Sequence, residues 1–118
     1  MVRKGNPLIL GNSLSWTRHA KMKRKQYGLS KSRVKRTIKY PDRVQTGVAS
    51  GTIASMKEAR TKRRTEIWVM YKITKEEGKE VIKIISTWKY PGESPKGDPP
   101  PIPDDVLQEL INQGLIDK

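Results

Sequence analysis

Two segments near the start of the chain have the composition and the end signals of short helices. Thr17 is a typical N-cap residue, and the residues after it are compatible with a helix until Gly28, which favours a C-terminal stop. Ser30 is placed to cap a second segment, which a Tyr-Pro pair ends because the residue before proline avoids the α region. The sequence therefore predicts helices over about 18–26 and 31–39.

After Asp42 the apolar residues change from helical to alternating spacing. This pattern predicts four strands, at residues 43–48, 51–59, 65–73 and 80–90. The last two are expected to form a hairpin, and because neither side of the third is wholly polar, one side should pack on the helices while the other is partly exposed or functional. The predicted fold is α+β, with two N-terminal helices packed on a four-stranded antiparallel sheet.

The end of the chain differs in composition from the rest. Residues 91–103 contain six prolines, which predicts a semi-rigid linker that no strand can cross. Asp104 and Asp105 are expected to cap a short helix with Val106, Leu107, Leu110 and Ile111 on one stripe. The predicted segments are a basic arm (1–13), an α+β nucleic-acid-binding domain (14–90), the linker (91–103) and an acidic amphipathic helix (104–118).

Charge is divided unevenly along the chain, whose formal net charge is +13. Residues 1–90 hold 23 Lys and Arg against 6 Asp and Glu, whereas residues 91–118 hold 2 against 6. The first forty residues contain twelve basic residues and no acidic one. Self-repulsion among like charges opposes folding, so this distribution favours a polyanionic partner. The alternative is a basic surface that only maintains solubility.

Several classes of protein are not favoured by the composition. There is no cysteine and a single histidine, and no motif for a protein-built metal site or a bound cofactor is present. No apolar run approaches the roughly 18 residues of a membrane-spanning helix, so a cytoplasmic protein without a membrane partner is expected.

Candidate phosphate contacts come from the first helix, from the strands and from the link between the second and third strands. They are Arg18, Lys21, Lys23, Arg24, Lys25, Arg43, Lys57, Arg60, Lys62, Arg63, Arg64 and Lys83. We interpret the cluster at 57–64 as a loop that tracks phosphates, since it shares the charge of the first forty residues. The alternative is a hairpin tip whose charges discourage edge-to-edge pairing.

Short motifs in the body of the chain resemble those of a known family. They are Trp16-Thr17-Arg18-His19-Ala20, Tyr27-Gly28-Leu29-Ser30, Tyr40-Pro41 and Ile85-Ser86-Thr87-Trp88. Residues 14–90 are similar to small His-Ala-containing bacterial domains of unknown function, which are related to the BrnT and RelE toxins of the barnase, EndoU, colicin and RelE ribonuclease superfamily. The resemblance implies a RelE/BrnT-like fold and a domain that binds or cleaves RNA. In the toxin-like case this domain is a metal-independent endoribonuclease with an acidic antitoxin as partner.

His19 is the candidate general base of such an enzyme. At the start of a helix and among cations, its pKa is expected below the ordinary value, which gives the neutral imidazole that a base requires. Thr87 is a candidate hydroxyl for a phosphate oxygen. Tyr71 is a candidate acid–base group, with Tyr27 and Tyr90 as alternatives, because RelE-like toxins often work with Arg, Lys and Tyr. A lone histidine is more often a packing residue, and the three tryptophans are expected in the core.

Two other functions stay open on the sequence alone. One is a non-catalytic module that binds nucleic acid or the ribosome, and the other is a basic regulator that binds an acidic protein. The tail also has two interpretations. Its helix could dock on the body and compete with RNA by placing carboxylates where phosphates bind, or it could pack for stability alone.

Overall fold

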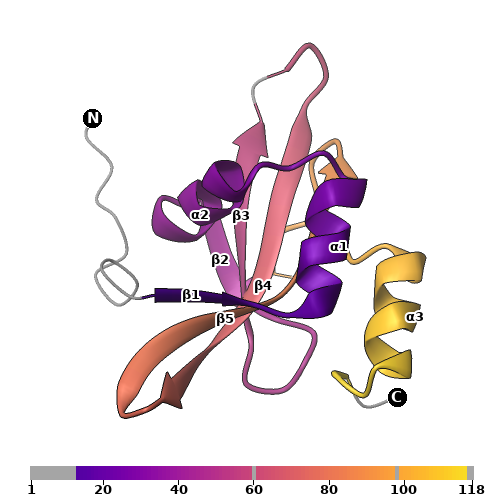
Figure 1. Ribbon diagram of the computed structural model, residues 1–118. Helices are drawn as coiled ribbons and strands as arrows, with labels where there is room; N and C mark the ends of the chain where they lie inside the picture. Colours follow the sequence, from indigo (N-terminus) through magenta and orange to yellow (C-terminus); the bar gives the residue numbers. More distant parts are fainter. Residues whose placement is uncertain (1–12, 60, 98, 117–118) are drawn as a thin grey trace.

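A computed structural model describes residues 13–59, 61–97 and 99–116, which form an α+β fold of three helices around a mixed five-stranded sheet (Figure 1). The helices are α1 (Arg18–Gln26), α2 (Lys31–Lys39) and α3 (Asp104–Asn112). The strands are β1 (Ser13–Trp16), β2 (Arg43–Thr46), β3 (Ile53–Ala59), β4 (Thr65–Glu76) and β5 (Lys79–Pro91). Their order across the sheet is β1-β5-β4-β3-β2. No helix in this part of the chain is long and apolar enough to span a membrane.

The two N-terminal helices begin and end as predicted. The Thr17 hydroxyl accepts a hydrogen bond from the backbone N–H of Ala20 at 3.0 Å, and the Ser30 hydroxyl accepts one from Arg33 at 3.0 Å. Each cap satisfies one of the backbone donors that the first turn leaves without a partner. Gly28 follows α1 with a φ of 66°, in the left-handed region that glycine adopts at little cost.

The tail helix α3 begins differently from the prediction. Its N-cap is Pro103, which has no side-chain hydrogen bond to offer. Asp104 and Asp105 instead occupy the first turn, where the helix dipole favours carboxylates. The predicted cap is therefore wrong, while the acidic start of this helix and its end before Gly114 are confirmed.

The sheet differs from the predicted four antiparallel strands by one edge strand. β2 to β5 form the antiparallel set, but β1 pairs in parallel with β5, with Ser13 beside Val81 and Trp16 beside Ile84. Four residues carry too short a pattern to indicate a strand, and only the edge of β5 makes β1 form. Of the predicted arm 1–13, only Ser13 is described and it belongs to β1; residues 1–12 lie outside the described residues.

Two turns set the lengths of the strands. The β4–β5 hairpin closes through Glu77 and Gly78, both with positive φ, which is the two-residue geometry that suits twisted strands. β2 stops at Thr46 rather than at residue 48, because the chain turns over residues 48–51, where the backbone N–H of Gly47 donates to the carbonyl oxygen of Thr52 at 2.9 Å. A Cβ atom on Gly47 would lie 2.1 Å from Oγ1 of Thr52, so this close approach requires glycine.

Both faces of the sheet are buried. One core cluster lies under α1 and α2 and includes Val34, Ile38 and Tyr71. The other is centred on Trp68 and Trp88, whose rings stack at 6.3 Å, and is covered by Val106 and Leu110 of α3. The predicted partly exposed face is therefore wrong, because the end of the chain covers it. The expectation that tryptophans lie in the core is confirmed for Trp68 and Trp88, which are fully buried.

Candidate nucleic-acid interface

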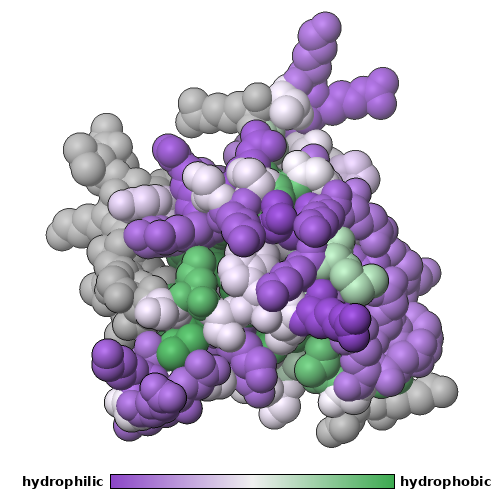
Figure 2. Space-filling model, in the orientation of Figure 1, coloured by the Kyte–Doolittle hydropathy of each residue, from purple (hydrophilic) through white to green (hydrophobic). Residues whose placement is uncertain are grey.

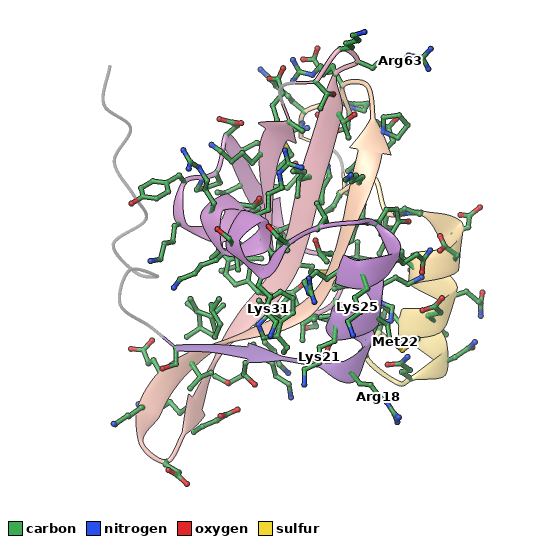
Figure 3. The ribbon with its side chains drawn as sticks, turned by 45° about the horizontal axis from the view of Figure 1, so that its top comes forward. Arg18, Lys21, Met22, Lys25, Lys31 and Arg63 are labelled. Carbon is green, nitrogen blue, oxygen red and sulfur yellow. The ribbon has the colours of Figure 1, made fainter. Side chains whose placement is uncertain are left out.

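A row of cations lies on the outer side of α1. Arg18, Lys21 and Lys25 are exposed, and their spacing of three and four residues places them along one side of the helix. We call these three residues the basic stripe. Figure 3 shows them on the same side of α1, with the exposed Met22 beside them and Lys31 at the start of α2. Within the described residues, none of the three makes a side-chain hydrogen bond or an ion pair.

The surface around the basic stripe is strongly hydrophilic. Figure 2 shows hydrophilic residues over most of this face, with only small hydrophobic areas between them. The whole of α1 and α2 lacks a carboxylate, and the last turn of each helix carries basic residues. Of the stripe, only Lys25 lies in the last turn, where the negative end of the helix dipole stabilises a cation; Arg18 lies in the first turn, where the dipole favours an anion. The stripe is thus available to an external anion.

The second predicted cluster lies away from the stripe. Lys62, Arg63 and Arg64 are exposed in the turn between β3 and β4, and Figure 3 shows Arg63 at the end of the molecule opposite Arg18. Arg64 also pairs with Glu58, at 3.2 Å. Arg60 lies outside the described residues. The structure therefore does not join α1 and residues 57–64 into one continuous face.

Lys23 is on α1 but is not part of its exposed surface. Its side chain is 1% exposed, and its ammonium group donates to Oε1 of Glu109 at 2.8 Å, to Oδ2 of Asp105 at 3.1 Å and to Oε1 of Gln26 at 2.9 Å. Burial alone would lower the pKa of Lys23, but the hydrogen bonds that it donates to Glu109 and Asp105, with the charges of these carboxylates, outweigh burial and raise the pKa. The predicted phosphate contact is corrected: this charge binds α3.

Arg24 and Arg43 also have structural partners. Nη1 of Arg24 donates to the carbonyl oxygen of Leu29 at 2.9 Å and so supports the α1–α2 connection. Arg43 is 13% exposed, lies over the Trp68 ring at 5.2 Å, and pairs with Glu66 at 3.1 Å. Neither guanidinium is free for a phosphate, and both predictions are corrected because internal acceptors hold these groups.

The two remaining predicted contacts lie on strands. Lys57 of β3 is half-buried, and its ammonium group donates to the carbonyl oxygen of Tyr40 at 3.0 Å. Lys83 of β5 is also half-buried and lies between Ser15 and Lys72 in the sheet register. Neither residue lies on α1, so neither extends the basic stripe.

The three candidate catalytic residues are all fully buried. Nε2 of His19 lies 2.8 Å from the Ser86 hydroxyl, and Nδ1 lies 3.4 Å from Oε2 of Glu109. The pKa of His19 is lowered as expected, but burial is the main cause and the carboxylate of Glu109 opposes it. The imidazole thus lies in the interior of the protein, beside Glu109 of α3.

Thr87 and Tyr71 use their hydroxyl groups inside the protein. The Thr87 hydroxyl donates to the carbonyl oxygen of Trp68 at 2.6 Å, and the Tyr71 hydroxyl lies 3.3 Å from that of Ser55. Burial raises the pKa of Tyr71. Ser86 and Thr87 are consecutive on β5 and therefore project to opposite faces, which separates Thr87 from His19. The arrangement gives no support to a shared active site.

Sequence reasoning missed two cations on α2. Arg33 and Arg36 are exposed and, together with Lys57, line a pocket of about 380 Å³ beside β3. Their spacing of three residues on an acid-free helix was the signal that would have found them.

Among the described residues, no group of His, Asp or Glu could hold a metal ion. The chain matches no protein-family model, no curated protein and no solved structure.

Proposed function

We propose that this protein binds RNA, without cleaving it, through the phosphate groups that reach the basic stripe. The observation that supports this most directly is the exposure of Arg18, Lys21 and Lys25, which have no partner among the described residues, on a helix that has no carboxylate. Lysine and arginine that neutralise phosphates release condensed counterions, and this release dominates the affinity of such surfaces. The choice of RNA over DNA rests on the resemblance to RelE-type and BrnT-type domains, which itself stays a prediction.

The non-catalytic interpretation is preferred over an endoribonuclease for a steric reason. A general base must come within about 3 Å of the proton it removes. His19, Thr87 and Tyr71 have no exposed surface, and Nε2 of His19 and the hydroxyl groups of Thr87 and Tyr71 already lie in internal contacts. An acidic protein partner would meet the same stripe, and salt dependence distinguishes it from a nucleic acid, whose affinity falls linearly on logarithmic axes.

The test is a binding titration of a short fluorescein-labelled RNA by anisotropy at several salt concentrations. Wild type is compared with the double variant Lys21→Glu/Lys25→Glu. The matched control is Lys75→Glu/Lys79→Glu, which makes the same change in net charge at the exposed β4–β5 hairpin. Circular dichroism verifies that all three proteins are folded. A DNA strand of the same sequence tests the preference for RNA.

We expect the stripe variant to bind RNA much more weakly, with a salt slope reduced by about 0.7 for each lost phosphate contact on a single strand. The hairpin control should retain most of the affinity. Equal losses in both variants, or an affinity that does not respond to salt, would contradict the proposal. Incubation of labelled RNA in EDTA separates binding from cleavage, since cleavage by wild type that is abolished in His19→Asn would instead support an endoribonuclease.

A further inference from the structure

An open pocket of about 380 Å³ lies between α2 and the strands β3 and β4. Its lining residues are Ser30, Ser32, Arg33, Arg36, Thr37, Lys57, Glu58, Ala59 and Ile67. The volume is at the lower end of the range of about 300–1,000 Å³ in which proteins hold small ligands. The pocket thus has room for a ligand larger than a simple ion.

The rim of this pocket is positively charged. Arg33 and Arg36 come from α2, one turn apart, and Lys57 comes from the neighbouring strand. In the described structure no ion pair or side-chain hydrogen bond engages the guanidinium of Arg33 or Arg36. Glu58 is the single carboxylate in the lining, and it pairs with Arg64 at 3.2 Å. Arginine in such a setting favours phosphate, which it can bind through two parallel hydrogen bonds.

The inner wall of the pocket is apolar. Ala59 and Ile67 are 7% and 2% exposed and belong to the core cluster under α1 and α2. A free inorganic phosphate would contact only the charged rim and would not reach the small part of Ala59 and Ile67 that the pocket leaves exposed. A nucleotide has both parts that the pocket offers to contact, namely a phosphate for the arginines and a flat, weakly polar base for the wall.

We infer that this pocket binds one nucleotide of the RNA, with its phosphate between Arg33 and Arg36 and its base against Ala59 and Ile67. The inference rests on the proposed function and deepens it, because it adds a defined site to a binding surface that is otherwise electrostatic. RNA bases are most often recognised when they are unstacked, so the site takes a nucleotide of a single-stranded segment rather than of a duplex.

Two measurements test the site. The first is RNA binding by Arg33→Ala/Arg36→Ala, with Lys31→Ala/Lys35→Ala as the control, since these exposed lysines lie on the same helix but do not line the pocket. Loss of two charge-assisted contacts should weaken binding of single-stranded RNA about tenfold or more, and the control should be affected less. A duplex RNA of the same sequence should show no difference between the two variants.

The second measurement uses NMR on the wild-type protein with uridine 5′-monophosphate, and separately with inorganic phosphate. The nucleotide should shift the methyl signals of Ala59 and Ile67 as well as the backbone amides of 30–33, whereas phosphate should shift the amides alone. If neither Ala59 nor Ile67 responds to the nucleotide, or if Arg33→Ala/Arg36→Ala binds RNA as well as its control, the pocket is not a nucleotide site.

The two proposals fail in different ways. If the stripe variant loses RNA binding while the pocket variant does not, the pocket inference is wrong and the proposed function stands. If wild type binds no RNA, the proposed function is wrong. In that case the nucleotide titration alone decides whether the pocket is a site for free nucleotides, and the absence of shifts there overturns the inference as well.

Discussion

The carboxylate of Glu66 connects the sheet to the end of the chain, and its removal is the sharpest test of how the fold is held. Glu66 is fully buried on β4. Its oxygens accept hydrogen bonds from Nε1 of Trp68 at 3.0 Å, from the Ser94 hydroxyl at 2.6 Å and backbone N–H at 3.1 Å, and from Nη2 of Arg43 at 3.1 Å. The substitution Glu66→Ala leaves all of these donors without their acceptor.

The expected loss of stability follows from the buried donors that Glu66→Ala leaves without an acceptor. Removing one partner of a buried ion pair costs about 3–5 kcal/mol, because the remaining charge stays desolvated. Arg43 retains other acceptors, since its Nη1 donates to the carbonyl oxygens of Ser94 and Pro95 at 3.3 and 3.2 Å. Within the described part of the chain, the indole of Trp68 and the backbone N–H of Ser94 have no such alternative. We therefore expect Glu66→Ala to lower the free energy of unfolding by about 3–5 kcal/mol.

The assay is urea denaturation followed by tryptophan fluorescence and by circular dichroism. Glu80→Ala at the exposed hairpin is the control and should change the unfolding free energy by less than about 0.5 kcal/mol. The double variant Arg43→Met/Glu66→Leu should be more stable than Glu66→Ala alone, because it removes both charges together. A loss below about 1 kcal/mol for Glu66→Ala would refute the reasoning, since it would mean that water satisfies the donors as well as the carboxylate does.

Two further predictions concern the surfaces that α3 covers. Leu110 is fully buried against the Trp68–Trp88 cluster, so Leu110→Ala should lower the free energy of unfolding, measured by urea denaturation, by about 2–5 kcal/mol. Gln108 is exposed on the same helix, and Gln108→Ala should change this free energy little. Equal effects of the two substitutions would show that α3 does not pack there. Because burial holds the pKa of His19 below its ordinary 6.5, its contribution to stability is fully present above that value and is lost as the pH falls towards the folded-state pKa. Denaturation at a series of pH values should therefore show a decrease below about pH 6.5 that is smaller in His19→Gln, and an identical pH dependence in the two proteins would contradict this.

The tail interpretation that the structure favours is packing for stability. Docking of the helix on its own body, with Asp105 and Glu109 on Lys23, agrees with the expectation from charge and periodicity. Asp104 is exposed and has no part in that contact. Val106 and Leu110 are fully buried, and Ser94 fixes the linker to Glu66. Undocking would expose the tryptophan cluster to water, so α3 is an integral part of the fold rather than a loosely tethered competitor for RNA.

Local signals were sufficient for the helices and for most of the sheet. Thr17 and Ser30 cap helices because their side chains reach backbone N–H groups only three residues away, which is an interaction within one turn. Gly78 adopts the positive φ of the β4–β5 turn at little cost, whereas Glu77 adopts it although residues with a Cβ atom disfavour it. Such interactions depend on neighbours in the sequence, so composition and spacing alone predicted these elements.

Of the candidate site, only the positive charge was predictable from the sequence. The absence of acidic residues from the first forty positions indicated an anionic partner, and no structure was needed for that inference. Which cations face the solvent is a different question, because Lys21 and Lys23 are identical residues two positions apart on one helix. They lie on different sides of α1, and only the docking of α3 makes Lys23 buried while Lys21 stays exposed.

Only the tertiary structure decided that the residues proposed for catalysis are buried and that β1 forms. His19 is buried because α3 returns from more than eighty residues away to cover it, and β1 forms because the edge of β5 supplies its hydrogen bonds. Arg33 and Lys57 share a pocket because α2 packs on β3. All of these are contacts between distant segments, and their free energy depends on which surfaces meet in the folded protein. The capped helices, the hairpin and the positive charge depend on near neighbours or on composition, so the sequence by itself determined them.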